Sequence, residues 1–163
     1  MISNNMKIFD NLLSVEEVNM IYKHIVYEKG FYFGEVDRKG LPPSGLVFNL
    51  DNEEKLFKDF FQLLRLKCDV DISSIQRAYV NMFLPSDRPY FHTDVNVNTC
   101  LFYINPMVNL DEGGETQFLI KNELVSVLPV PGRMIIFDGN ILHRATSFRN
   151  IPRITLAIKM FKK

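Results

Sequence analysis

Two histidines and one aspartate form the pattern in this sequence that could do chemistry. His92 and Asp94 stand two residues apart in the segment PYFHTD, and His143 lies far downstream in ILHRATSF. If PYFHTD is a strand, as its aromatic residues predict, the side chains of His92 and Asp94 point the same way and can reach one metal ion. The pair alone is weak evidence, because a His/Asp pair joined by a hydrogen bond is the ordinary alternative.

A set of two histidines and one carboxylate favours iron over zinc. Three such ligands on one face of an octahedral ion leave the other positions open, as an Fe(II) centre needs for a chelating cosubstrate and dioxygen. A structural zinc site is usually closed by cysteine, and the chain has only Cys68 and Cys100. A hydrolytic zinc would need a nearby general base, which the sequence does not identify.

Arg153 could bring a positive charge to the same place. It follows His143 across a predicted turn, so we expect the two residues on neighbouring antiparallel strands with both side chains pointing inward. A guanidinium buried there needs a carboxylate from the protein or from an acidic ligand. Thr155 and Ala157 share the face of Arg153 and leave room for a small dicarboxylate. The alternative is an arginine on an edge strand, exposed to water.

A strand-rich fold with helical support must position these residues. Residues 14–30 and 51–69 show apolar stripes at helical spacing, and each begins with a capping residue, Ser14 and Asp51. From residue 72 onward, short β-branched or aromatic segments are separated by Pro, Gly, Asn and Asp. Strands at this spacing without helices between them predict an antiparallel sandwich or barrel. The expected strands are SSIQRAYVNMFL, PYFHTD, NTCLFYINP, ETQFLI, ELVSVLPV, RMIIFD, ILHRATSF and RITLAIKMF.

Length and composition favour one domain. The chain has 163 residues, of which 47% are hydrophobic, and this is enough for one globular core. We expect a single domain over residues 1–163, in which residues 1–71 supply helical and sheet support and residues 72–163 form the core. The segments FYFGEV and GLVFNL are expected to extend one sheet. The loops DRKGLPPSG and LPSDRPYF are expected to shape the entrance of the site.

Charge and targeting signals indicate a cytoplasmic protein. Two cysteines are too few for a disulfide framework, and the first ten residues lack the features of a signal peptide. No apolar run reaches the roughly 20 residues that span a bilayer, so we expect no membrane partner. The equal numbers of basic and acidic residues, 19 of each, disfavour nucleic acid as a partner without ruling it out. The sequence does not fix the oligomeric state.

Five motifs in the second half of the chain occur in a characteristic order. They are HTD, CLFYIN, DEGGETQFL, PGRMIIFDGNILHRA and RITLAIKM, within residues 77–160. Their order and spacing resemble those of the Fe(II)- and 2-oxoglutarate-dependent dioxygenases, in particular the branch similar to prolyl 4-hydroxylases. The resemblance implies a mainly β fold of the α+β class. Its core would be a double-stranded β-helix, or jelly-roll, with two N-terminal helices packed against the larger sheet.

The same resemblance implies roles for individual residues. The catalytic metal ligands would be His92, Asp94 and His143. The residues that bind 2-oxoglutarate, with the arginine pairing with its distal carboxylate, would be Arg153, Tyr103, Thr155 and Thr116. For Tyr103 an ordinary core tyrosine is the alternative.

One position departs from the family pattern. Many relatives have a tyrosine shortly before the first metal histidine, where this sequence has Phe83, which cannot form a hydrogen bond. Tyr79 and Asn81 share its strand face, and with Phe83 they are the candidates for substrate contact. The segment LPSD replaces an expected glycine and argues against a prolyl substrate.

The resemblance implies an oxidoreductase, specifically a hydroxylase. It would use Fe(II), 2-oxoglutarate and O2, with ascorbate as a candidate reductant. It would decarboxylate 2-oxoglutarate to succinate and hydroxylate a prolyl or other peptidyl side chain or a small metabolite. The alternative is a non-catalytic jelly-roll protein, a sensor that holds a metal or an acidic metabolite. Three metal ligands together with Arg153 favour the enzyme, since a barrel that only binds metal has no need of the arginine.

Overall fold

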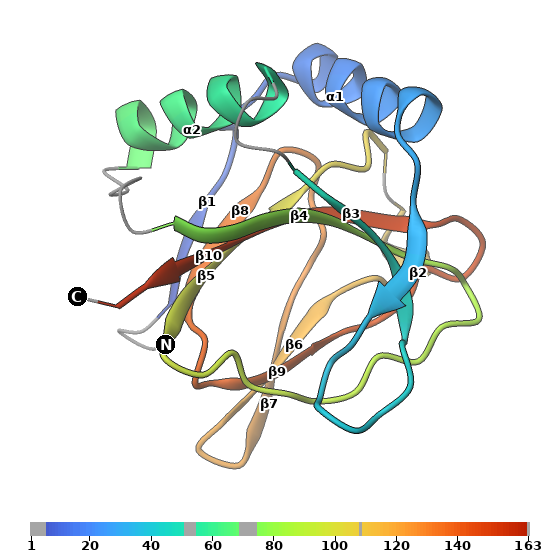
Figure 1. Ribbon diagram of the computed structural model, residues 1–163, viewed down its shortest axis with the longest axis vertical. Coiled ribbons are helices and arrows are strands. Elements are labelled where there is room, and N and C mark those ends of the chain that lie inside the picture. The colour runs from blue at the N-terminus through green and yellow to red at the C-terminus, as the bar shows by residue number, and fades with distance from the viewer. Residues whose placement is uncertain (1–5, 51–54, 69–74, 108, 163) are drawn as a thin grey trace.

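Two antiparallel sheets form the body of the protein (Figure 1). The computed structural model describes residues 6–50, 55–68, 75–107 and 109–162. Within them, the larger sheet has the order β1-β8-β5-β10-β4-β3-β2 and the smaller sheet has the order β7-β6-β9. The strands of the larger sheet are β1 (Met6–Phe9), β2 (Tyr32–Glu35), β3 (Gly45–Asn49), β4 (Ile75–Phe83), β5 (Val97–Tyr103), β8 (Met134–Asp138) and β10 (Arg153–Phe161). The strands of the smaller sheet are β6 (Thr116–Ile120), β7 (Glu123–Val127) and β9 (Leu142–Ala145).

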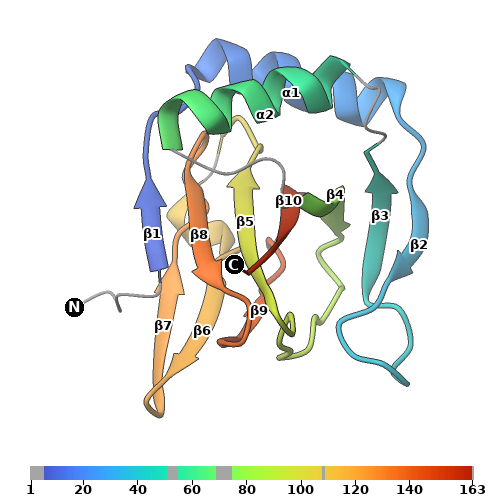
Figure 2. The same ribbon diagram turned by 60° about the vertical axis from the view of Figure 1, so that its left-hand side comes forward.

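Two helices cover one face of the larger sheet, and the smaller sheet lies toward its other face (Figures 1 and 2). The helices are α1 (Val15–Glu28) and α2 (Lys55–Cys68), and Leu110–Glu112 forms a short 3₁₀ turn. This arrangement confirms the predicted mainly β jelly-roll with N-terminal helices on the larger sheet. No helix among the described residues is long and apolar enough to cross a membrane.

The side chains of β10 point alternately to the two faces of the larger sheet, so one set lies in the core and the other lies in the site. The side chains that pack toward the helices belong to one apolar cluster, and they are Ile154, Leu156 and Ile158. The side chains on the opposite face line a cavity between the sheets, and they are Arg153, Thr155, Ala157 and Lys159. One strand in the centre of the larger sheet therefore supplies both the core and a wall of the site.

Helix α1 begins as the sequence predicts. Glu17 N donates to Ser14 Oγ at 3.2 Å, and Ser14 N donates to Glu17 Oε2 at 2.8 Å, so both halves of the capping box form. The cap predicted at Asp51 for the second helix lies outside the described residues.

Two strand assignments differ from the sequence-based expectation. The sequence does not predict β1, a short edge strand that pairs with β8. The segment PYFHTD is not a strand, because within it only His92 forms a bridge, and its partner is His143. Each of the other segments expected to form strands contains one, and FYFGEV and GLVFNL do lie in one sheet.

Candidate metal and cosubstrate site

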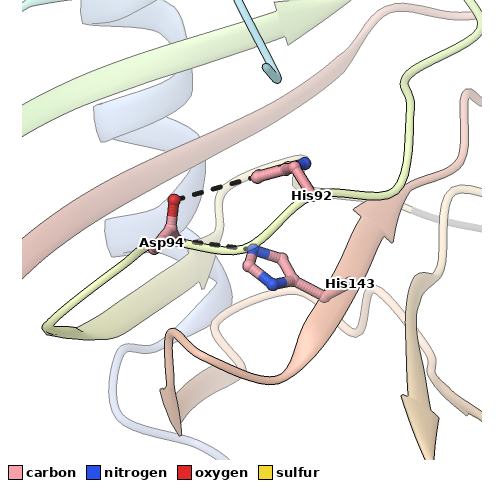
Figure 3. Close-up of side chains that lie close together, drawn as sticks. All are labelled: His92, Asp94 and His143. Carbon is pink, nitrogen blue, oxygen red and sulfur yellow. Dashed lines mark ion pairs between the residues drawn. The ribbon is translucent and has the colours of Figure 1, made fainter. Parts of the chain in front are cut away.

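The side chains of His92, Asp94 and His143 converge, as the sequence predicts (Figure 3). One ligand atom from each of them lies within 4.8 Å of the others. Nε2 of His143 is 3.4 Å from Oδ2 of Asp94, and Nε2 of His92 is 3.9 Å from Oδ1 of the same carboxylate. Two imidazoles and one carboxylate around a common point can hold a divalent metal ion.

Backbone hydrogen bonds, rather than a continuous strand, bring these residues together. His92 N donates to His143 O and His143 N donates to His92 O, both at 2.9 Å. Asp94 N donates to Gly139 O at 2.7 Å. A side chain at Gly139 would prevent this approach, since a Cβ atom there would lie 2.4 Å from Asp94 O. A single bridge and a glycine contact thus replace the strand predicted for PYFHTD.

Both imidazole rings turn Nε2 toward Asp94. Nδ1 of His92 lies 3.0 Å from Tyr90 O, and Nδ1 of His143 lies 2.7 Å from Ile141 O. A carbonyl oxygen only accepts hydrogen bonds, so each Nδ1 carries a proton and Nε2 is the atom left for a metal. These carbonyl contacts fix the ring orientation that a metal ligand needs.

The protonation states of His92 and Asp94 also suit the binding of a metal ion. Burial lowers the pKa of His92, and the neighbouring His143 lowers it further, which favours the neutral ring. Burial opposes ionisation of Asp94, but the contact with His143 and the charge of Lys159 outweigh it and hold the pKa of Asp94 well below its usual range. Lys159 Nζ forms an ion pair with Asp94, and Thr99 Oγ1 donates to Asp94 Oδ2 at 2.6 Å. The site therefore offers a carboxylate and a neutral imidazole.

Arg153 lies inside the protein with 1% of its surface exposed, which excludes the alternative of a solvated edge-strand arginine. Its guanidinium donates to three neutral acceptors, Gly114 O at 2.7 Å, Thr116 Oγ1 at 3.0 Å and Thr155 Oγ1 at 3.4 Å. Among the described residues, no carboxylate lies within 4.0 Å of it. Burial lowers the pKa of Arg153, yet an arginine stays charged in proteins. Its charge is therefore available to an acidic ligand.

His143 and Arg153 do not lie on neighbouring strands, so this prediction is wrong. Strand β9, which carries His143, pairs with β6 in the smaller sheet, whereas Arg153 begins β10 in the larger sheet. Both side chains nevertheless line one cavity between the sheets, together with Thr116 and Thr155.

Tyr103 lies at the Arg153 end of this cavity. It is 1% exposed and belongs to the apolar cluster between the sheets, as a core tyrosine would. Its hydroxyl also lies 2.6 Å from Thr116 Oγ1, and Cζ of Arg153 is 5.4 Å from the centre of its ring. Burial raises the pKa of Tyr103, so the hydroxyl keeps its proton. Tyr103 is thus both a core residue and part of the polar surroundings of Arg153.

The three residues expected to contact substrate line the cavity from β4, and they are Tyr79, Asn81 and Phe83. Oδ1 of Asn81 is buried without a hydrogen-bond partner in the described part of the chain. Phe83 is paired with Arg153 in the β4–β10 register. The structure therefore places all three beside the metal ligands and the arginine.

Three charged residues that the sequence does not single out also line the cavity, and they are Glu35, Asp37 and Lys159. The sequence could have predicted the position of Lys159, because it lies on the same strand face as Arg153, at every second residue of the strand. The sequence holds no such signal for Glu35 and Asp37. They reach the site only because β2 folds back beside β3, which in turn pairs with β4.

Solved structures similar to this one include several prolyl hydroxylases and a 2OG-Fe(II) oxygenase family member, although protein-family models and curated protein sequences give no match. A prolyl-4-hydroxylase of Pseudomonas putida superposes with a TM-score of 0.73 at 14% identity, over 97% of this chain and 93% of that one. A prolyl hydroxylase of Trichoplax adhaerens, in complex with a hypoxia inducible factor peptide, gives 0.72 at 19% identity, over 98% and 84%. A viral collagen prolyl hydroxylase of Paramecium bursaria Chlorella virus-1, a 2OG complex, gives 0.69 at 17% identity, over 99% and 97%. This chain therefore has the jelly-roll fold of the prolyl 4-hydroxylase-like branch of the 2OG-Fe(II) oxygenases.

Proposed function

We propose that this protein is an Fe(II)- and 2-oxoglutarate-dependent oxygenase that hydroxylates a C–H bond of a peptidyl or small-molecule substrate. One observation carries the proposal. His92, His143 and the buried Arg153, which has no carboxylate partner among the described residues, line the same cavity. A barrel that only bound metal would gain nothing from a buried guanidinium that has no carboxylate in contact with it, because burying the charge costs free energy. The peptide bound to the similar T. adhaerens hydroxylase supports a peptidyl substrate.

The metal would be held by His92, Asp94 and His143. Two imidazoles and a carboxylate are donors that suit Fe(II), and ligands from one side leave further positions open. When bound, Fe(II) with 2-oxoglutarate and O2 supplies oxidative decarboxylation to succinate and the transfer of one oxygen atom to a C–H bond. The protein would contribute by holding the reactants in place and by keeping water out.

Arg153 would hold the distal carboxylate of 2-oxoglutarate, because a guanidinium fork matches a carboxylate. Thr155 and Tyr103 would add hydroxyl groups at the same end. Apolar rings protect the other end, since the ring of Phe137 lies 4.7 Å from that of His143, centre to centre. A dry pocket strengthens the ion pair between Arg153 and its ligand.

Anaerobic spectroscopy tests the proposal. Protein mixed with Fe(II) and 2-oxoglutarate without oxygen should show the visible metal-to-ligand charge-transfer band of a chelated keto acid. His143→Ala should lose the band because the metal loses a ligand. Arg153→Ala should still bind iron but should need at least about tenfold more 2-oxoglutarate, the cost of a lost charged hydrogen bond. Arg149→Ala removes an exposed arginine and is the matched control.

Two results would contradict parts of the proposal. If the wild type binds metal but shows no band with 2-oxoglutarate, the protein is a non-catalytic metal- or metabolite-binding jelly-roll. If Arg153→Ala takes up 2-oxoglutarate as well as the wild type does, Arg153 is not the anchor of the cosubstrate.

A further inference from the structure

The cavity around the metal ligands continues into an open cleft. The two spaces share wall residues, among them Glu35, His92 and Lys159. Arg153 lines only the cavity, and Asp94 lines only the cleft. The end of the cavity that holds Arg153, where the cosubstrate would bind, is therefore separate from the cleft. A substrate that enters through the cleft passes Glu35 on its way to the metal ligands.

Glu35 is the one charged side chain in these walls that makes no hydrogen bond or ion pair with another described residue. Each of the other charged side chains has a partner. Lys159 forms an ion pair with Asp94 and donates to Thr99, and Arg77 donates to Asn49 Oδ1 at 2.8 Å. Asp37 accepts from Tyr90 N at 2.8 Å, and Arg153 donates to its three acceptors. Burial raises the pKa of Glu35, although the charges of Arg77 and Lys159, which form no hydrogen bond with it, oppose the rise.

Asp37 fixes the position of Glu35 relative to the metal ligands. Its side chain is 3% exposed, its Oδ2 accepts the hydrogen bond from Tyr90 N, and its Oδ1 is 3.7 Å from Nδ1 of His92. Arg38 adds a second contact, with Cζ 5.7 Å from the centre of the Tyr90 ring. The end of β2 is thus attached to the segment that carries His92, and Glu35 is held beside the site.

We propose that Glu35 selects a substrate with a cationic nitrogen, such as a lysyl or arginyl side chain, and orients it in the cleft. The proposal rests on the proposed function, because the metal ligands define where the reacting carbon lies. An ammonium or guanidinium group would donate to Glu35 the charged hydrogen bond that no described protein group provides.

A prolyl ring does not suit this wall of the cleft. Proline within a peptide has no N–H group, so it would cover Glu35 without giving the carboxylate a partner. Removing a carboxylate from water without a new partner is costly. The charge at Glu35 therefore discriminates against proline and in favour of a basic side chain.

Binding to protein loaded with Zn(II) and 2-oxoglutarate, which cannot turn over, tests the role of Glu35 apart from activity. The probes are the N-acetyl methylamides of lysine, arginine, proline and glutamate, titrated by calorimetry. The wild type should bind a cationic probe at least about tenfold more tightly than the proline probe, and Glu35→Gln should remove this difference. Glu35→Lys should turn the preference toward the glutamate probe. Glu123→Gln, at an exposed position of β7, is the matched control.

The role of Glu35 is overturned if neither cationic probe binds the wild type more tightly than the proline probe does. It is also overturned if Glu35→Gln keeps the cationic preference. The anaerobic band with Fe(II) and 2-oxoglutarate separates these failures from a failure of the proposed function. A band without cationic preference leaves the oxygenase and removes the role of Glu35. A cationic preference without a band leaves Glu35 as the selecting residue of a binding protein.

Discussion

Burial of Glu35, which suits it to bind a cation, should also reduce the stability of the protein. Burial is the main cause that raises the pKa of its carboxyl above the ordinary 4.5. The charges of Arg77 and Lys159 oppose this rise, and those of Asp37 and Asp94 add to it. The folded state therefore holds this proton more tightly than the unfolded state. Stability falls as the pH rises from 4.5 through the raised pKa.

Glu35→Gln should accordingly raise the melting temperature at neutral pH, by about 2–4 °C for each kcal/mol gained in a chain of this length. The gain should vanish below about pH 4.5, where Glu35 is protonated in both states. Thermal unfolding of the metal-free protein across this pH range measures the effect, with Glu123→Gln as the exposed control. Equal melting temperatures for Glu35→Gln and the wild type at neutral pH would contradict the assigned burial cost.

Arg153 presents a second conflict between stability and binding. Arg153→Met keeps much of the side-chain length and removes the buried charge, so the lost bonds to Gly114 and Thr116 are offset by a lower desolvation cost. We expect its unliganded stability to be close to that of the wild type. At about a hundredfold the dissociation constant, 2-oxoglutarate should stabilise the wild type by about 2.7 kcal/mol and leave the variant unchanged. Thermal shift with and without 2-oxoglutarate measures this, and a strongly destabilised unliganded variant would assign Arg153 a structural role.

Among the strands, the alternation of apolar and polar side chains explains which strands and which inward-facing residues could be predicted from the sequence. In RITLAIKMF every second residue is apolar and packs toward the helices, so β10 and the inward position of Arg153 follow from a local pattern. The segment PYFHTD has the composition of a strand, but its one bridge joins His92 to His143, a partner that no local pattern identifies. For the same reason the sequence wrongly places His143 beside Arg153, although β9 pairs with β6.

The loop between β2 and β3 depends on Asp37 for its attachment to the site. Asp37→Ala should free residues 36–44 from Tyr90 and weaken Zn(II) binding by about tenfold, because outer contacts of a metal-binding histidine typically matter this much. Asp37→Asn keeps an oxygen for Tyr90 N and should retain most of the affinity. Hydrogen exchange of residues 36–44 and a metal titration measure both effects. Unchanged exchange in Asp37→Ala would show that other contacts hold the loop.

The turn between β8 and β9 positions Asp94 through close backbone contact. In Gly139→Ala the new Cβ would lie 2.4 Å from Asp94 O and 2.7 Å from Asp94 Cβ, so the backbone must shift. We expect the variant to fold but to bind Zn(II) at least about tenfold more weakly, a loss typical of disturbed ligand geometry. Circular dichroism and a metal titration separate the two effects. Gly30→Ala, where nothing lies within 4 Å of the new Cβ, should behave like the wild type.

At the scale of the whole molecule, the candidate metal site joins the two sheets. His143 lies on β9 of the smaller sheet, and Asp94 lies just before β5 of the larger sheet. The apolar cluster between the sheets already holds them together through residues such as Phe118 and Ile135. A metal bound by both sheets would add a direct link, so its binding free energy would oppose their separation.

Zn(II) should therefore slow amide hydrogen exchange in β6 and β9 more than in α2, which packs against the far face of the larger sheet. With metal at about a hundredfold its dissociation constant, exchange that requires release of the metal should slow by up to about a hundredfold. His143→Ala should abolish the effect in β6 and β9, since the smaller sheet would then supply no ligand. If Zn(II) binds the wild type but leaves exchange in β9 unchanged, His143 does not share a site with Asp94, because a shared ion cannot stay bound while the two sheets separate.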